Sequence, residues 1–412
     1  MTQRRDDEDR CPGKGMSIII SIEKLLIVKR RGEPAYRRKA YGEMSGRQAG
    51  DLTFSGSGRT IPRRRLAQAD PGLMQAPVVA VVGATGLVGE VLLRIFEERD
   101  FPMRELRPMA SARSAGSSVA FRGQEWEVCE ARADAFAGVD LVFFAATGAL
   151  SRELAPAAVA AGATVIDKSS TWRLSDGVPL IVPEINADQI PTTPSILACP
   201  NCSTIGVVQA LAPIHAAAGL KQVIITTMQA ASGAGRDGIE ELRQQREAVA
   251  AGEEPGLAQV FGAQLADNVV PHCDAFEADG YTREESKLLH EARKILGLPE
   301  LPVTATCVRV PVEVGHSASI LVETERPLEV EEARSALAAH PGVRVVDAPV
   351  AARYPTPQEV AGTDEVLVGR IRKDRADPHR LWLWQVADNV RKGAATNAVQ
   401  TAEAWLKARS AD

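Results

Sequence analysis

The chain has 412 residues, of which 45% are hydrophobic and 25% charged, and its net charge is −5. This length and composition predict a globular protein with room for two domains. The negative charge and the 4% content of aromatic residues argue against nucleic acid as a partner and favour a small-molecule ligand. The apolar run at 17–28 is interrupted by Glu23 and Lys24 and is too short to cross a membrane. Six dispersed cysteines favour a reducing compartment, hence the cytoplasm.

Residues 1–76 differ in composition from the rest of the chain. They contain sixteen Lys and Arg against nine Asp and Glu, a net charge of +7, so the remaining residues carry −12. No hydrophobic period is sustained in them, which predicts a disordered extension. The alternative is upstream sequence translated from a misassigned start, with Met74 as the natural beginning.

The segment "PVVAVVGATGLVGEVLLRIFEER", which starts at Pro77, reads as a strand, a glycine-rich turn and a helix. Gly83, Gly86 and Gly89 would let the backbone approach a pyrophosphate and aim the N–H groups of the helix N-terminus at it. We therefore expect a dinucleotide site here. A glycine turn that only packs a helix closely on a sheet is the alternative.

Three more apolar strands are predicted at 105–111, 139–147 and 164–170, with a short helix at 153–162. Alternation of short apolar strands with helices is typical of a doubly wound parallel sheet. The predicted fold class is α/β, with an N-terminal Rossmann-type sheet.

The loop after the second strand favours NADP over NAD. An acidic residue would be expected there if the ribose carried free hydroxyls, and none is present. Ser111, Arg113 and Ser114 instead supply a cation and hydroxyl donors that suit a 2′-phosphate. A solvated loop with an incidental arginine stays open as the alternative.

Two cysteines three residues apart, Cys199 and Cys202, occur in "ACPNCSTIG". No second ligand pair at comparable spacing accompanies them, so a zinc site is not predicted. The residues after Cys202 form a helical pattern with an apolar stripe, and a helix N-terminus stabilises a thiolate. We therefore expect Cys202 to be the nucleophile, with two inert buried thiols as the alternative. The stripe consists of Val207, Val208, Leu211 and Ile214.

A thiolate beside a nicotinamide suggests interconversion of an aldehyde and an acyl group through a thiohemiacetal and a thioester. Such chemistry needs a base. The strands predicted within 306–324 are interrupted by Arg309 and His316. A structural histidine is the alternative to a catalytic one.

Eight segments in order resemble the aspartate-β-semialdehyde dehydrogenase family: "GATGLVG", "SARSAG", "DKSSTWR", "ACPNCSTIG", "QAASGAG", "YTREESK", "CVRVPVEVGHS" and "DNVRKGAATNA". The resemblance covers 77–408. It implies NADPH-dependent reductive dephosphorylation of L-aspartyl-4-phosphate to L-aspartate-4-semialdehyde, a step towards lysine, methionine and threonine.

The resemblance also implies roles for single residues. Cys202 matches the acyl-enzyme nucleophile, His316 the acid/base, and Gln229 the residue that orients the acyl group. Arg309 matches the arginine that binds the substrate α-carboxylate. Glu284 matches the carboxylate near the substrate amino group.

Phosphate would be held by Arg173 and Lys287, with Asn201 beside them. Without the resemblance, Glu284 and Lys287 would pass as an exposed ion pair. They lie on an amphipathic helix whose start carries a capping box of Thr282 and Glu285.

The implied architecture has an NADP-binding domain at 77–203, an α+β substrate and dimerisation domain at 204–384, and a C-terminal helix at 385–412 that returns to the first domain. A homodimer or a dimer of dimers is implied. Thr85, Gly86, Leu87 and Val88 match the pyrophosphate loop, and Ser232, Gly233 and Asn389 match later cofactor contacts. Ala394, Ala398, Thr401, Ala402 and Trp405 lie on one side of the predicted C-terminal helix.

Two alternatives stay open. N-acetyl-γ-glutamyl-phosphate reductase performs the same chemistry on a substrate with a capped amine, and Glu284 argues for a free ammonium instead. A non-catalytic dinucleotide-binding protein would usually lack the nucleophile or the base, and both are present.

Overall fold

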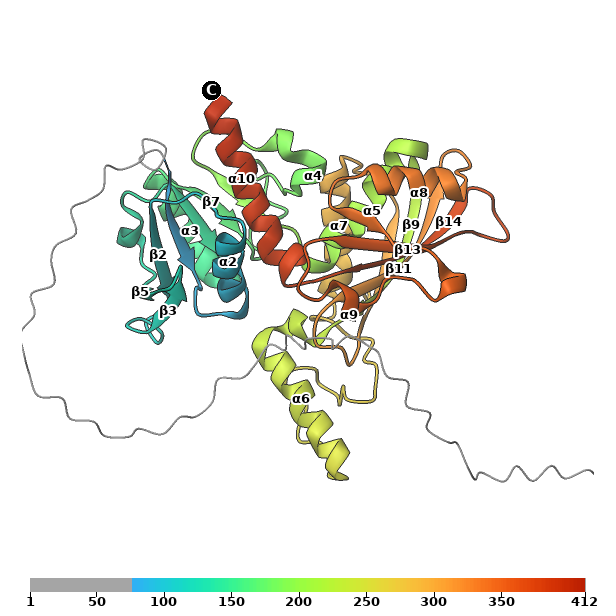
Figure 1. Cartoon of the computed structure of the whole chain (residues 1–412), viewed down its shortest axis with the longest axis horizontal. Coiled ribbons are helices and arrows are strands. Elements are labelled where there is room, and N and C mark those ends of the chain that lie inside the picture. The colour runs from blue at the N-terminus through green and yellow to red at the C-terminus, as the bar shows by residue number, and fades with distance from the viewer. Residues whose placement is uncertain (1–75, 412) are drawn as a thin grey trace, which may run out of the picture. The chain divides into compact units, whose positions relative to one another are not determined.

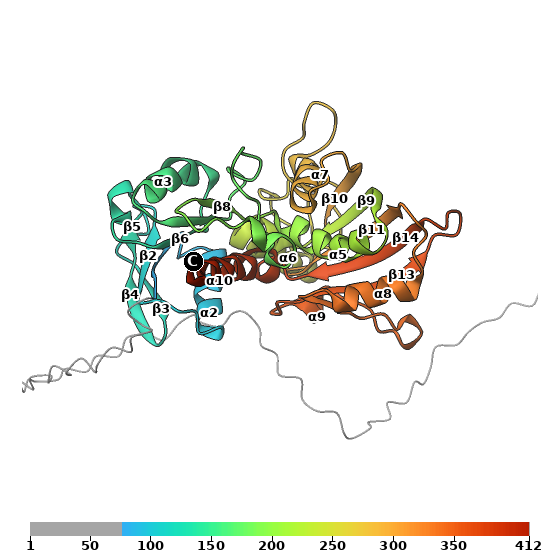
Figure 2. The ribbon, with the colours of Figure 1, turned by 90° about the horizontal axis from the view of Figure 1, so that it is seen from above.

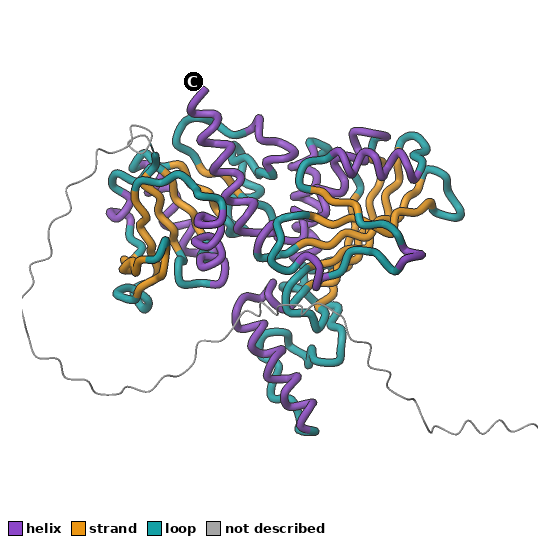
Figure 3. Tube along the Cα trace, in the orientation of Figure 1, coloured by secondary structure: helices purple, strands orange, loops and turns teal. Residues whose placement is uncertain are grey.

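The computed structural model describes residues 76–411. The extension predicted for 1–76 therefore lies outside the described residues, apart from Ala76. Within the described part of the chain, the strands form two six-stranded sheets and one two-stranded sheet, β3 (Ser118–Phe121) with β4 (Gln124–Glu127). Figure 3 shows the two large sheets as separate groups of strands.

The first large sheet is parallel throughout, with the strand order β5-β2-β1-β6-β7-β8. Counted along the chain this is the 3-2-1-4-5-6 order of dinucleotide-binding sheets, which confirms the predicted fold class. Its strands are β1 (Val78–Val82), β2 (Glu105–Ala110), β5 (Cys129–Glu130), β6 (Leu141–Phe144), β7 (Thr164–Asp167) and β8 (Ile196–Ala198).

Helices cover both faces of this sheet, so its central strand is buried along its whole length. Side chains alternate along β1: Val79 and Val81 pack with α2 (Leu87–Glu98) and α10 (Thr396–Ala411), whereas Val78, Ala80 and Val82 pack with α3 (Gly148–Ala160). Figures 1 and 2 show α10 beside α2. The C-terminal helix thus returns to the first sheet.

The second large sheet is mixed, with the strand order β10-β9-β11-β14-β13-β12. Its strands are β9 (Leu220–Gln229), β10 (Val303–Arg309), β11 (His316–Thr324), β12 (Val343–Val345), β13 (Val366–Lys373) and β14 (Arg380–Ala387). Three helices pack on one face: α5 (Cys202–Ala218), α7 (Arg283–Leu296) and α8 (Val330–Ala339). The remaining helices are α4 (Pro183–Asn186), α6 (Gly235–Ala251) and α9 (Pro357–Val360). Figure 1 shows α6 extending away from this sheet.

Helix α5 carries the chain from the first sheet to the second. The sequence predicts an apolar stripe on it, but the structure buries twelve of its residues, on nearly every side. The reason is that α5 packs against α7 and α8 as well as against the strands. Its first residue, Cys202, therefore follows the last strand of the first sheet and begins a helix that packs on the second.

The C-terminal segment begins with a π-helical turn, Arg391–Ala395, before α10, where the sequence predicts one regular helix. The five residues predicted to share a buried side are all buried, Trp405 being 2% exposed. No helix within residues 76–411 combines the length and apolar character needed to span a membrane.

Candidate active site

A cavity of about 600 Å³ opens where α5, β9, β10 and α7 converge. Seven of the residues singled out in the sequence line it: Asn201, Cys202, Gln229, Gly233, Glu284, Lys287 and Arg309. Arg173 and His316 are not among the lining side chains. His316 nevertheless reaches the cavity through its contact with Cys202.

Cys202 and Cys199 lie in different surroundings. Cys202 is the first residue of α5, and Asn201 caps that helix by accepting the Ser203 N–H at 2.9 Å. The Cys202 Sγ lies 3.4 Å from His316 Nε2. Cys199 is fully buried among the apolar residues around the first sheet. The structure thus pairs only Cys202 with a histidine.

Burial opposes the thiolate stabilisation expected from the start of α5. It raises the pKa of the Cys202 thiol, and the Glu284 carboxylate raises that pKa further, while Lys168, Arg173 and Arg309 act in the opposite direction. The net direction of the pKa shift is upwards.

His316 begins β11, and both of its ring nitrogens have neighbours. Nδ1 accepts the Ala230 N–H at 3.0 Å, so the neutral ring carries its proton on Nε2, which faces the Cys202 sulfur. Burial, with a smaller effect from Arg309, lowers the pKa of His316 well below its usual value. Acceptance of a proton at Nε2 requires the ring proton to move to Nδ1, which then no longer accepts the Ala230 N–H.

Arg309 is the last residue of β10, and its guanidinium is only partly paired. Its Nη1 donates to the Ala230 carbonyl at 2.7 Å, but within the described chain its buried Nε has no hydrogen-bond partner. The guanidinium lies 5.6 Å from the centre of the Phe261 ring. A buried unpaired donor is costly unless a ligand satisfies it, and a substrate carboxylate has the required chemistry.

Glu284 and Lys287 are not the exposed pair that their helix pattern suggests. Glu284 is 7% exposed and accepts hydrogen bonds from Asn201 Nδ2 at 3.0 Å, Gln229 Nε2 at 3.2 Å and Lys287 Nζ at 3.0 Å. Lys287 also donates to Asp274 at 2.6 Å. The predicted capping box at the start of α7 is present and confirmed.

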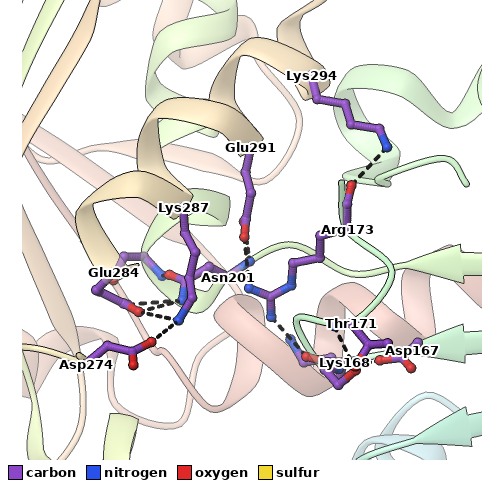
Figure 4. A network of polar contacts seen from close by, with 12 residues as sticks. Asp167, Lys168, Thr171, Arg173, Asn201, Asp274, Glu284, Lys287, Glu291 and Lys294 are labelled. Atoms are coloured by element: carbon purple, nitrogen blue, oxygen red, sulfur yellow. Dashed lines mark hydrogen bonds and ion pairs between the residues drawn. The ribbon is translucent and has the colours of Figure 1, made fainter. Parts of the chain in front are cut away.

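Arg173 is held behind the cavity by the same helix. Its Nη1 donates to Glu291 at 2.9 Å and its Nη2 to the Lys168 carbonyl at 2.9 Å. Figure 4 shows Asn201 between Arg173 on one side and Lys287 with Glu284 on the other. The two cations predicted to bind phosphate therefore flank the residue that precedes Cys202.

In the glycine turn after β1, the backbone lies very close to neighbouring backbone atoms. Gly83 has φ +89, and a Cβ there would lie 2.4 Å from the Ala145 carbonyl oxygen. A Cβ on Gly89 would lie 2.2 Å from the Gly83 carbonyl oxygen, so α2 packs tightly on the turn. This cradle leaves Thr85, Gly86, Leu87 and Val88 partly or fully exposed at the start of α2. These features fit a dinucleotide pyrophosphate.

The loop with Ser111, Arg113 and Ser114 follows β2, which pairs in parallel with β1, so it lies at the same sheet edge as the glycine turn. Arg113 is exposed there. On the other side of the site, Asn389 Nδ2 donates to Ser232 Oγ at 2.9 Å, and Asn389 Oδ1 accepts the Gly315 N–H at 3.0 Å.

Gly233 lies against the Arg309 guanidinium and the His316 ring. A Cβ on it would stand 2.7 Å from Arg309 Nη1 and 3.1 Å from the His316 ring. A side chain at this position would therefore displace both groups.

Comparisons with known proteins show the family of this chain. Residues 78–193 match the family described as "Semialdehyde dehydrogenase, NAD binding domain", and residues 211–392 match "Semialdehyde dehydrogenase, dimerisation domain". The aspartate-semialdehyde dehydrogenase of Aquifex aeolicus is 50% identical over 332 residues, which are 80% of this chain and 98% of that protein. The chain belongs to the aspartate-semialdehyde dehydrogenase family.

Solved structures of aspartate-semialdehyde dehydrogenases share the fold. Enzyme II from Vibrio cholerae, complexed with ASA, superposes with a TM-score of 0.78 at 41% identity and covers 81% of this chain and 99% of its own. The Candida albicans enzyme with NADP superposes with a TM-score of 0.63 at 25% identity, covering 82% and 99%. The matched domain shows that this chain binds a nicotinamide dinucleotide.

Three residues that lie beside the candidate site were not singled out in the sequence: Phe261, Lys168 and Glu291. Phe261 lies in a loop that Glu241 of α6 holds by accepting the backbone N–H groups of residues 259–261. No local sequence pattern predicts these hydrogen bonds. Glu291 follows Glu284 by two helical turns, so the helix period could have placed it on the same face. The period gives no indication of its partners.

Proposed function

We propose that this chain catalyses the NADPH-dependent reductive dephosphorylation of L-aspartyl-4-phosphate to L-aspartate-4-semialdehyde, in the route to lysine, methionine and threonine. The observation that carries the proposal is the 3.4 Å contact between Cys202 Sγ and His316 Nε2, at a cavity that Arg309 and Glu284 also line. A nucleophilic sulfur in contact with an imidazole that can exchange a proton with it is the arrangement that acyl transfer to sulfur requires.

In the proposed reaction, the Cys202 sulfur attacks the acyl carbon, and the bond from that carbon to the phosphate oxygen breaks. Phosphate leaves between Arg173 and Lys287, and an acyl-thioester remains on Cys202. Bound NADPH supplies the hydride that reduces the thioester. His316 accepts the thiol proton at Nε2 as the sulfur attacks, once its ring proton has moved to Nδ1. Hydride addition gives a thiohemiacetal anion whose C–S bond then breaks, so that the semialdehyde leaves and the freed sulfur takes its proton back from Nε2. Gln229 orients the acyl group.

Substrate choice follows from two side chains of opposite charge. The unpaired Arg309 Nε suits the α-carboxylate, and Glu284, in the same cavity, suits a free ammonium. An N-acetylated substrate offers no cation to Glu284. This contrast favours aspartyl phosphate over N-acetylglutamyl phosphate.

We further propose NADP as the cofactor, because Arg113 and its neighbouring serines follow β2 where the ribose would lie. The five cysteines within the described residues are free, in keeping with the cytoplasm. A homodimer or a dimer of dimers is proposed through the residues matched to the dimerisation domain. The proposed domains are 77–203, 204–384 and 385–412.

The test is run in the reverse direction, with phosphate and NADP. The wild-type protein should reduce NADP with L-aspartate-4-semialdehyde and phosphate, and should use N-acetylglutamate semialdehyde poorly. Glu284→Gln should reduce the ratio of activity with aspartate semialdehyde to activity with N-acetylglutamate semialdehyde, because it removes the charge that recognises the ammonium. Equal use of both aldehydes by the wild type would refute the assigned substrate.

A further inference from the structure

Glu291 lies behind the proposed site, on the face of α7 that carries Glu284 and Lys287. It is 1% exposed, and both carboxylate oxygens are engaged. Oε1 accepts from Arg173 Nη1 at 2.9 Å, and Oε2 accepts the backbone N–H of Asn201 at 2.6 Å. Figure 4 shows this carboxylate pointing from α7 toward both partners. One buried group thus joins an arginine to the N-cap residue of α5.

The contact fixes the Arg173 guanidinium in a defined plane. Glu291 and the Lys168 carbonyl take one donor each from Nη1 and Nη2, while Nε is buried without a partner in the described chain. Arg173 is 7% exposed, so Glu291 is also what neutralises its charge. The remaining donors of a guanidinium held in this way suit an anion with several oxygens.

The second contact fixes the residue before the nucleophile. Asn201 donates its N–H to Glu291 and its Nδ2 to Glu284, and its Oδ1 accepts the Ser203 N–H. Both its main chain and its side chain are therefore held by carboxylates of α7. Since Cys202 is the next residue, these carboxylates set where its sulfur lies.

We propose that Glu291 is a positioning residue for the phosphate step: it orients Arg173 toward phosphate and holds Cys202 in place through Asn201. The inference rests on the proposed function, in which Arg173 binds phosphate. None of the hydrogen bonds of Glu291 involves Arg309, His316 or the glycine turn. Its loss should therefore affect phosphate use and turnover rather than binding of the dinucleotide.

The test is steady-state reduction of NADP with aspartate semialdehyde and varied inorganic phosphate. In Glu291→Gln the KM for phosphate should rise about tenfold to a hundredfold and kcat should fall, while the KM for NADP stays within about twofold. If Glu291→Gln does not fold, Glu291→Asp, which keeps the charge and shortens the side chain, takes its place with the same expectation.

The matched control is Glu285→Gln. Glu285 is also a buried carboxylate on α7, but it accepts the backbone N–H groups of Thr282 and Cys307, and within the described chain neither of these partners is a proposed site residue. This variant should unfold at a lower temperature with an unchanged KM for phosphate.

If the folded Glu291 variant turned over at the wild-type rate and its KM for phosphate were unchanged, the inference about Glu291 would be overturned, while the proposed function would stand. An equal rise of the KM values for phosphate, NADP and aspartate semialdehyde would also overturn it, because such a rise would indicate that Glu291 has only a structural role. A wild-type protein without phosphate-dependent turnover would overturn the proposed function, and this inference with it.

Discussion

Cys199 and Cys202 are three residues apart, yet only one of them has the surroundings of a nucleophile. Cys202 begins a helix and contacts His316, whereas Cys199 is buried in the core beside the first sheet. The sequence could indicate which thiol lies at a helix start. It could not reveal how strongly burial opposes ionisation, because that depends on the packing of α7 and β10 around the sulfur.

At the residue scale, the buried His316 predicts a pH dependence of stability. Its folded pKa lies well below its usual value, so below about pH 6.5 the unfolded chain binds a proton that the folded protein does not. The free energy of unfolding is therefore unaffected by His316 above about pH 6.5. It falls by about 1.4 kcal/mol per pH unit between the pKa of His316 in the unfolded chain and its lower pKa in the folded protein.

This prediction is checked by measuring the free energy of unfolding between pH 7 and pH 5 for the wild type and for His316→Asn. The variant should show the shallower loss on acidification. Parallel curves would mean that His316 titrates in the folded protein as it does in the unfolded chain.

Arg113 provides a second prediction at this scale. Arg113→Ala should raise the KM for NADP by roughly tenfold to a hundredfold, since a charge-assisted hydrogen bond to the 2′-phosphate is lost. Use of NAD should hardly change, because NAD lacks that phosphate. Arg375→Ala, which alters an exposed arginine between β13 and β14, is the control and should behave as the wild type. Equal losses with both cofactors would place Arg113 elsewhere.

At the scale of elements, the regular parts of the fold were predictable from the sequence. The strand, glycine turn and helix after Pro77 are present, because their apolar periods reflect burial on a sheet. The sequence does not predict the π-helical turn at Arg391–Ala395, which packs against α5 and α2. Glu284 and Lys287 were recognised only by resemblance, because their amphipathic helix also has the pattern of an exposed one.

The π-helical turn brings the C-terminal segment against Cys202. A Cβ on Gly393 would lie 3.0 Å from the Cys202 carbonyl oxygen and 3.2 Å from the Cys202 Cβ. Gly393→Ala should therefore shift Cys202 away from His316 and lower kcat by about tenfold or more. Gly256→Ala, where a Cβ meets nothing within 4 Å, should leave kcat unchanged. Wild-type kcat in Gly393→Ala would show that this contact does not position the sulfur.

At the scale of the molecule, the site depends on contacts that no local pattern contains. The bonds of Glu291 join residues 90 and 118 positions apart in the sequence, and Arg309 meets Phe261 only once β10 and the loop after α6 are folded. Sequence reasoning recognised the family, and it proposed Cys202 as the nucleophile. The network that holds the nucleophile could only come from the structure.

We predict that two copies of this chain associate through the second sheet. On the face away from α5, α7 and α8, Ile224 is 39% exposed and pairs across the sheet with Leu321, which in turn pairs with Trp382. Ile224→Asp should weaken the dimer, because it puts a charge into an apolar row. Sedimentation velocity would measure this, with Leu257→Asp, at a residue 88% exposed in the loop after α6, as the control. An unchanged dimer would exclude this face.

The central claim is that Cys202 alone carries the acyl group, and it is tested most directly by mass spectrometry of the peptide that contains both thiols. The protein is mixed with NADP and aspartate semialdehyde without phosphate, so that a thioester forms and is not released by phosphate. The account predicts an aspartyl adduct on Cys202, retained in Cys199→Ser, absent in Cys202→Ala and removed when phosphate is added. An adduct on Cys199, or turnover that survives in Cys202→Ala, would contradict it.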